Sequence, residues 1–324
     1  MNRRILLSLF PFALLALTLV VIVPGCDEAE EADLPAENER SGAGAAYAHT
    51  RKILSFGPRP PGSAGLSNTR KYITAQLEQL GWEVTPQTFS RKVNAFVQDQ
   101  RQGGLIPFRR EMRFTNLIAR FGDSAENDIE GLLCAHIDSK LYLDRTFLGA
   151  DDAASAVGVI LELARQLKEH PEMATRLELV FFDGEEAFGQ NISPSDGLYG
   201  SKHYARVWQG AAHKPGFGIV LDMIGHKNLQ IRYPSDTPVF LEKVLLEAAR
   251  AADASERFKR GLNPIMDDHV ALNGAGIPSI DVIGDFSQFP WWHTSRDNLR
   301  LISRDSLEIT LQVTWAMLNA LLPD

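Results

Sequence analysis

The sequence predicts an α/β protein: a single domain in which helices flank a central, largely parallel mixed sheet. Two observations support this class. Apolar stretches of strand length alternate with helical stretches along most of the chain, which is the pattern of helices packed on a parallel sheet. The 324-residue chain is 44% hydrophobic and 23% charged, and these values are typical of a globular protein with a large core.

The first elements are two helices followed by three strands. Apolar residues recur at helical spacing over 45–56 and 67–80. The run Gly57-Pro58-Arg59-Pro60-Pro61-Gly62 separates these helices, because glycine and proline interrupt regular structure. Strand-like stretches follow at 82–89, 114–121 and 131–136.

The rest of the chain repeats the alternation of helix and strand. Residues 153–168 form a clear amphipathic helix, whose apolar face consists of Val157, Ile160, Leu161, Ala164 and Leu167. Three further strands are predicted at 177–182, 218–223 and 278–283, and two further helices at 238–252 and 307–322. In a sheet of this kind, ligands bind at the carboxyl ends of the parallel strands.

The N-terminus predicts export. Arg3 and Arg4 precede an apolar stretch over 5–23, and Pro24-Gly25-Cys26 follows it. This is the pattern of a secretory signal, and its end resembles a bacterial lipobox, in which the cysteine is lipidated. We therefore expect a signal peptide at 1–25, a flexible acidic tether at 26–41 and a catalytic domain at 42–324, facing the periplasm or exterior or secreted. The alternative is an uncleaved membrane anchor, since 19 apolar residues just span a bilayer.

Charge and cysteine content exclude two kinds of function. Removal of residues 1–25 leaves 31 basic against 41 acidic side chains, a net charge of −10. No basic stripe is present, so we expect no nucleic-acid partner, and contact with a membrane only through the N-terminal lipid or anchor. Apart from Cys26, the only cysteine is Cys134, which lies inside an apolar strand, where a thiol is usually a small core residue. We therefore expect no cysteine-based catalysis.

Two adjacent carboxylates, Glu185 and Glu186, follow the apolar strand 177–182. Burying such a pair beside a sheet is costly unless a cation or hydrogen-bond donors compensate, because the two charges repel each other. Neighbouring side chains also leave the backbone in different directions, so one can bind a metal while the other acts as acid or base. The pair therefore predicts a metal site with a proton-transferring group beside it.

Other acidic and histidine residues also follow predicted strands. They are His136 and Asp138, Asp151 and Asp152, Asp222, Asp267-Asp268-His269, and Trp291-Trp292-His293. Oxygen and imidazole ligands from separate strand ends suit zinc, whose catalytic sites keep one position open for water or substrate. The sequence thus predicts a zinc enzyme.

These motifs resemble peptidase family M28, and within it the glutaminyl-peptide cyclotransferases, from about Arg51 to the C-terminus. The most specific are His136-Ile137-Asp138-Ser139-Lys140, Gly149-Ala150-Asp151-Asp152, Phe181-Phe182-Asp183-Gly184-Glu185-Glu186-Ala187-Phe188, Leu198-Tyr199-Gly200-Ser201 and Trp292-His293-Thr294. The resemblance implies the zinc aminopeptidase-like fold. It also implies an acyltransferase that converts the N-terminal glutamine of peptides or proteins to pyroglutamate and releases ammonia.

The resemblance also implies a role for each site residue. Asp152, Glu186 and His293 would bind one zinc ion, and Glu185 would be the general acid/base, in a hydrogen-bonded network with Asp222 and Asp268. Trp292 and Phe289 would bound the substrate pocket. His136 and Asp138 would be an inner structural pair, in which Asp138 orients the imidazole.

An M28-type aminopeptidase with two zinc ions is the alternative. His136 and Asp222 would then bind the second ion, and an activated water would hydrolyse the N-terminal peptide bond. The sequence also departs from the animal cyclases, which place a Trp where Gly189-Gln190-Asn191-Ile192 stands here, and the stretch 286–291 differs in length. These departures leave the substrate preference open.

Overall fold

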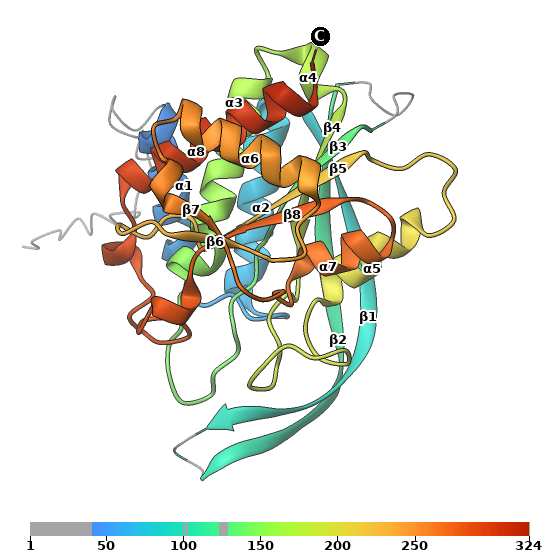
Figure 1. Ribbon diagram of the computed structural model, residues 1–324. Helices are drawn as coiled ribbons and strands as arrows, with labels where there is room; N and C mark the ends of the chain where they lie inside the picture. Colours follow the sequence, from blue (N-terminus) through green and yellow to red (C-terminus); the bar gives the residue numbers. More distant parts are fainter. Residues whose placement is uncertain (1–40, 100, 102, 123–128, 324) are drawn as a thin grey trace, which may run out of the picture. The chain divides into compact units, whose positions relative to one another are not determined.

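The computed structural model describes residues 41–324, except 100, 102, 123–128 and 324 (Figure 1). The signal peptide and all but the last residue of the tether predicted above lie outside this part. No helix within the described residues is long and apolar enough to cross a membrane.

A six-stranded mixed sheet forms the centre, in the order β1-β2-β4-β3-β5-β8 (Figure 1). Strands β4, β3, β5 and β8 run parallel to one another, whereas β1 pairs antiparallel with β2 and β2 pairs antiparallel with β4. The fold class predicted from the sequence is confirmed. The strands of the sheet are β1 (Trp82–Asp99), β2 (Gly104–Phe121), β3 (Gly131–His136), β4 (Leu177–Phe182), β5 (Phe217–Asp222) and β8 (Ser279–Ile283), and β6 (Ile231–Tyr233) and β7 (Phe258–Arg260) form a separate parallel pair.

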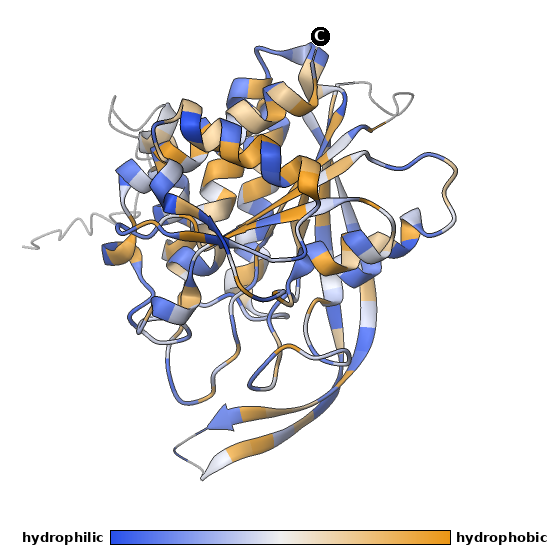
Figure 2. Ribbon diagram, in the orientation of Figure 1, coloured by the Kyte–Doolittle hydropathy of each residue, from blue (hydrophilic) through white to orange (hydrophobic). Residues whose placement is uncertain are grey.

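Helices cover both faces of the sheet because side chains of alternating residues in each strand point to opposite faces. On one face, Leu133 and Ala135 of β3 join the main core, to which α1, α2, α3, α6 and α8 contribute. On the other face, Leu132 and Cys134 pack with Tyr204 of α5 and Leu272 of α7. Cys134 is thus a buried free thiol, as expected from its strand. Figure 2 shows hydrophobic residues along the central strands. The helices are α1 (Gly42–Ser55), α2 (Ala64–Gln79), α3 (Ala156–Leu167), α4 (Pro171–Ala174), α5 (Tyr199–Trp208), α6 (Val239–Ala251), α7 (Asp268–Gly274) and α8 (Arg304–Leu321).

Two expectations about the elements were incomplete. The first two strands extend to 18 residues each and form a long hairpin that projects from the sheet (Figure 1). Its outer half has a small core of its own, in which Val93, Ala95 and Val97 of β1 alternate with exposed residues. The second difference is that the helix predicted from 153 is preceded by an irregular π-helical turn, η4 (Ala150–Ser155), and becomes regular only at α3.

His49 in α1 gives the protein a testable pH dependence away from the sheet edge. Its Nδ1 lies 2.6 Å from the Tyr72 hydroxyl, and burial lowers its pKa to about 4, although the charge of Glu162 opposes the shift. The unfolded chain binds a proton near pH 6.5 and the folded chain only near pH 4, so stability is lost as the pH falls through this window. Between pH 7.5 and 5, we expect His49 to lower the free energy of unfolding by about 1–2 kcal/mol.

His49→Gln keeps a hydrogen-bond acceptor for Tyr72 but does not titrate. Urea unfolding of both proteins at pH 7.5 and 5 should show a smaller loss in the variant, by the amount stated. Equal losses would contradict the assignment, since the other titrating groups contribute equally to both proteins.

Candidate active site

The carboxyl ends of the parallel strands deliver the main acidic and histidine side chains to one edge of the sheet. β3 ends at His136 and β5 ends at Asp222, while Glu185 and Glu186 follow the end of β4 after a two-residue turn. Asp152 lies in η4, and His293 lies in the segment between β8 and α8. Residues far apart in the sequence therefore converge here, as the strand-end argument predicted.

Asp152, Glu186 and His293 form the first of two compact groups. His293 Nε2 lies 3.4 Å from Asp152 Oδ2 and 3.4 Å from Glu186 Oε1. One ligand atom from each residue lies within 4.8 Å of the others. The structure thus brings together the three residues that the resemblance assigned to the zinc.

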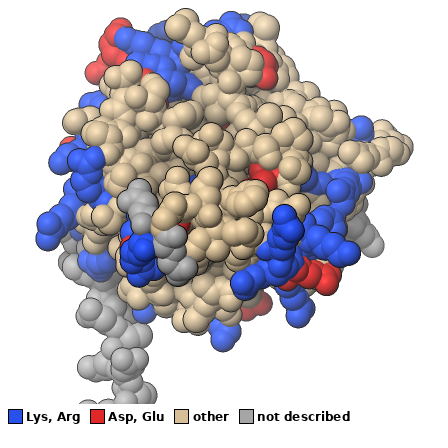
Figure 3. All heavy atoms as spheres, turned by 90° about the horizontal axis from the view of Figure 1, so that it is seen from below, with Lys and Arg blue, Asp and Glu red and all other residues tan. Residues whose placement is uncertain are grey.

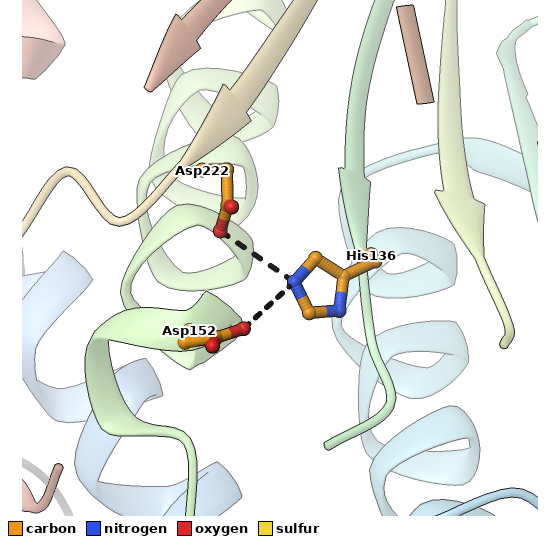
Figure 4. A group of neighbouring side chains, drawn as sticks. All are labelled: His136, Asp152 and Asp222. Atoms are coloured by element: carbon orange, nitrogen blue, oxygen red, sulfur yellow. Dashed lines mark ion pairs between the residues drawn. The ribbon is translucent and has the colours of Figure 1, made fainter. Parts of the chain in front are cut away.

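His136, Asp152 and Asp222 form the second group (Figure 4). His136 Nε2 lies 3.2 Å from Asp152 Oδ1 and 3.5 Å from Asp222 Oδ1, while its Nδ1 lies 3.5 Å from Asp138 Oδ1. Asp138 is therefore placed to orient the imidazole, and the other ring nitrogen faces the two carboxylates. Asp152 belongs to both groups and directs one oxygen to each.

The residues of the two groups fit a divalent metal. Glu186 Oε1, Asp222 Oδ1 and both ring nitrogens of His136 are buried and have no hydrogen-bond partner within the described part of the chain. Burial lowers the pKa of His293, but the charges of Glu186 and Asp152 outweigh it and raise the pKa to about 9. The carboxylates therefore require a positive partner, and oxygen and nitrogen donors in this arrangement are those that zinc binds.

Glu185 lies beside these groups in a cluster of buried acids. Burial raises its pKa well above the usual value, opposed by His136 and reinforced by Asp267 and Glu186. Burial also raises the pKa of Asp222 to about 8, although His136 opposes the shift. A carboxyl group with a raised pKa is suited to general acid/base chemistry near neutral pH.

Asp267, rather than Asp268, reaches the cavity next to Glu185. Asp267 caps the N-terminus of α7, its side chain accepts a hydrogen bond from the Asp268 backbone, and it lines the cavity. Asp268 is fully buried, does not line the cavity, and makes no hydrogen bond to Glu185. The predicted network of Glu185, Asp222 and Asp268 is thus corrected in one member, because the cap geometry turns the first aspartate of the pair toward the site.

A cavity of about 280 Å³ opens above these acids. Trp292 is part of its wall, as expected, but Phe289 is not. The Phe289 ring stacks on Trp291 at 4.9 Å and lies 4.7 Å from His226, and Phe286 takes the place in the wall. The remaining lining residues are Lys140, Asp152, Glu185, Glu186, Gln190, Asn191, Ile192, Asp222, Met223, Pro264, Ile265, Met266, Asp267, Ile283 and His293.

In Figure 3, the molecule is seen from below, and Lys and Arg side chains gather around the margin of a largely uncharged middle.

Hydrogen bonds from neighbouring loops fix the turn that carries Glu185 and Glu186. The Asp138 carboxylate accepts the backbone N–H of Glu185 at 3.1 Å and that of Glu186 at 3.3 Å. The Asp196 carboxylate accepts the N–H groups of Phe188 at 3.0 Å and Gly189 at 2.8 Å. The two glutamates therefore stand on a turn whose backbone donors are satisfied at both ends.

Gly184 is required at the start of this turn. Its φ is +79°, and a Cβ there would lie 2.5 Å from a ring carbon of Phe114. Gly184→Ala should lower both stability and turnover, because the strained φ costs about 1–2 kcal/mol and the clash displaces the glutamates at a further cost of about 1–3 kcal/mol.

Gly210→Ala is the matched control, since Gly210 has a φ of +84° and nothing within 4 Å of its added Cβ. It should lose only the stability that the strained φ costs and should keep full activity. Urea unfolding and turnover of both variants test this, and equal losses would show that the contact with Phe114 is unimportant.

Two further residues support the site without having been singled out in the sequence. Arg59 is buried and donates to the carbonyls of Ile137 at 3.0 Å and Gly149 at 2.9 Å, which joins the two ends of the loop between β3 and η4. Asp297 accepts the N–H of Asp152 at 3.3 Å, and burial raises its pKa to about 7. Neither residue carries a sequence signal beyond its position near a glycine-proline run or after the Trp-His-Thr segment.

Comparison with known proteins agrees with this geometry. Peptidase family M28 matches residues 116–318, and the chain belongs to this family. The glutaminyl-peptide cyclotransferase of Bothrops jararaca is 31% identical, and the alignment covers 79% of this chain and 76% of that protein. The prediction from the sequence motifs is thus confirmed: within M28, the chain is related to the glutaminyl-peptide cyclotransferases.

Solved structures show the same fold. The glutaminyl cyclase of Porphyromonas gingivalis is 29% identical, with a TM-score of 0.72 over 86% of this chain and 98% of that one. A Zn-dependent exopeptidase from Parabacteroides distasonis is 26% identical, with a TM-score of 0.70 over 87% of this chain and 98% of that one. The fold thus occurs with both activities between which the sequence left a choice.

Proposed function

We propose that this protein is a zinc-dependent glutaminyl-peptide cyclotransferase. It converts the N-terminal glutamine of a peptide or protein to pyroglutamate and releases ammonia. The observation that carries the proposal is the placement of Glu185, a buried carboxyl with a raised pKa, beside the Asp152–Glu186–His293 group in one cavity. The relationship to the glutaminyl-peptide cyclotransferases supports the choice of reaction.

Asp152, Glu186 and His293 would hold the zinc ion. When bound there, zinc supplies a Lewis acid that polarises the γ-carbonyl of the glutamine. Zinc held by three protein ligands would keep a further position for the substrate, and Glu185 lines the same cavity as the three residues that would hold the ion.

Glu185 moves the proton that the reaction transfers. The α-amine of the substrate attacks the carbonyl carbon of the side-chain amide, Cδ, and the new carbon–nitrogen bond forms while the bond from Cδ to the side-chain nitrogen breaks. Glu185 takes one proton from the attacking amine and gives it to the departing nitrogen, which leaves as ammonia. Asp267 lines the same cavity, and its negative charge favours the protonated form of Glu185. Trp292 and Phe286 enclose the substrate and limit access of water.

The aminopeptidase alternative rests on the second group, His136, Asp152 and Asp222. With metal ions in both groups, the site would match a two-metal hydrolase, in which a bound water is the nucleophile. The similarity to the Zn-dependent exopeptidase agrees with this alternative.

Two peptides separate the activities: one that begins with glutamine and one that begins with leucine. The proposal requires ammonia and a retained, cyclised peptide from the first, and no free leucine from the second. Elemental analysis should find about one zinc per chain. Release of leucine together with nearly two zinc ions per chain would replace the proposal by the aminopeptidase.

We also propose that the protein is exported and held at a membrane by lipid on Cys26. The basic, apolar and lipobox-like order of residues 1–26 supports this. Mass spectrometry of the N-terminal peptide from cells that express the protein tests it: a diacylated Cys26 agrees, and an unmodified N-terminus that retains residues 1–25 does not.

A further inference from the structure

Lys140 is one of two Lys or Arg side chains that are buried among the described residues, the other being Arg59. It follows the end of β3 and lies in the wall of the cavity. Its ammonium donates to the carbonyl oxygen of Ala187 at 2.8 Å and to Glu186 Oε2 at 3.4 Å. A buried cation thus contacts a residue that would bind the zinc.

Arg59 has a different task. Its guanidinium donates to the main-chain oxygens of Ile137, Leu148 and Gly149, and none of these hydrogen bonds reaches a carboxylate. Among the buried Lys and Arg side chains described, Lys140 is therefore the one that is paired with an acid of the site.

The contact makes the two oxygens of Glu186 unequal. Oε2 faces the ammonium of Lys140, whereas Oε1 faces His293 Nε2 at 3.4 Å and has no hydrogen bond. Oε1 is therefore the oxygen of Glu186 that faces His293 in the candidate zinc site. A charge-assisted hydrogen bond to one oxygen also withdraws negative charge from the whole carboxylate.

We propose that Lys140 is a positioning residue of the zinc site: it occupies Glu186 Oε2, so that Glu186 offers the metal a single oxygen of reduced charge. Two consequences follow for the metal. A coordination position stays open for the substrate, and the ion keeps more of its positive charge for polarising a carbonyl. The same positive charge repels the ion, so Lys140 lowers zinc affinity while it raises reactivity.

This combination distinguishes the proposal from a purely structural role. If Lys140 only held the loop through Ala187, its loss would loosen the site and lower zinc affinity and turnover together. If it touched the substrate directly, its loss would lower turnover and leave zinc affinity unchanged. The proposal alone predicts that the two quantities move in opposite directions.

Lys140→Gln tests this, because the amide can still donate to the Ala187 carbonyl but carries no charge. We expect zinc to bind about 3–10-fold more tightly and kcat to fall about 10-fold, with KM little changed, in line with other residues that act behind metal ligands. Zinc affinity is measured by competition with a chelator, and kcat and KM with a peptide that begins with glutamine. In the Co²⁺-substituted protein, the visible absorption of Lys140→Gln should weaken, as Glu186 becomes a two-oxygen ligand and the coordination number rises.

Lys202→Gln is the matched control. Its ammonium also donates to main-chain carbonyls, those of Ser193, Pro194 and Gly197, but to no zinc ligand, so zinc affinity and the Co²⁺ spectrum should stay at wild-type values. Lys140→Arg keeps the charge and should lie closer to wild type in all measurements than Lys140→Gln.

Weaker or unchanged zinc binding by Lys140→Gln overturns the proposal. A Lys140→Gln chain that fails to fold also overturns it, since the ammonium would then be required for folding. The proposal rests on the zinc site of the proposed function but not on its substrate. If the wild-type protein does not cyclise glutamine peptides, the proposed function fails, and the zinc titration and Co²⁺ spectrum still decide the role of Lys140.

Discussion

Glu185→Gln is expected to keep its metal and to lose about 10²–10⁴-fold in turnover, which is the usual contribution of a general acid/base. The amide has the size of the carboxyl group but cannot accept and return a proton. Metal binding should persist, because Glu185 belongs to neither group of candidate ligands. The measurements are ammonia release from a peptide that begins with glutamine and zinc per chain by elemental analysis.

The Gln190→Glu variant is a useful comparison, since Gln190 lines the same cavity without belonging to either group of candidate ligands. It should retain far more activity than Glu185→Gln, because it keeps the carboxyl group of Glu185 and changes only another residue of the wall. Near-wild-type turnover of Glu185→Gln would exclude Glu185 as the proton carrier.

Removal of the His293 imidazole should lower activity as strongly as Glu185→Gln does. Removal of the His136 imidazole should have a different effect on zinc binding and turnover. His293→Ala removes one of three ligands of the first group, so zinc affinity should fall more than about 100-fold and activity should disappear. Zinc titration by chelator competition and ammonia release measure the two effects. Full zinc binding by His293→Ala would show that the metal sits elsewhere.

His136→Ala is the informative partner. If one zinc is held by Asp152, Glu186 and His293, this variant keeps a metal and part of its turnover. His136 then binds no metal and only contacts the Asp152 carboxylate, at 3.2 Å. If two ions are bound, it loses one ion together with hydrolytic activity. The same two measurements on both variants therefore report the number of metal ions.

The central fold could be predicted because its strands are short apolar runs that are buried on both faces. The strands 131–136 and 177–182 agree with the structure residue for residue. The outer halves of β1 and β2 were missed, because polar and basic residues such as Arg91, Lys92 and Arg110 break their apolar runs into short pieces. Helices α5 and α7 were missed because they are short, with ten and seven residues, so a helical period is hard to recognise in them.

The meeting of the site residues could also be predicted, because parallel strands end at the same edge of the sheet. Which of two similar residues in the same segment lines the cavity could not be predicted from the sequence. Asp267 and Asp268 look equivalent in sequence, and only the start of α7 between them decides which one faces the cavity. Phe286 and Phe289 are both aromatic residues of one loop, and the stack of Phe289 with Trp291 and His226 is a tertiary contact without a local signal.

The shared position of Asp152 has a consequence for metal loading. Cations at the two groups would be held by opposite oxygens of one carboxylate, so each would weaken the hold on the other through mutual repulsion and competition for the same negative charge. Loading would then be stepwise and anticooperative, with a tight first equivalent and a weak second one. A small change in the environment of Asp222 would suffice to gain or lose the second ion, which offers a short evolutionary route between a transferase and a hydrolase on one scaffold.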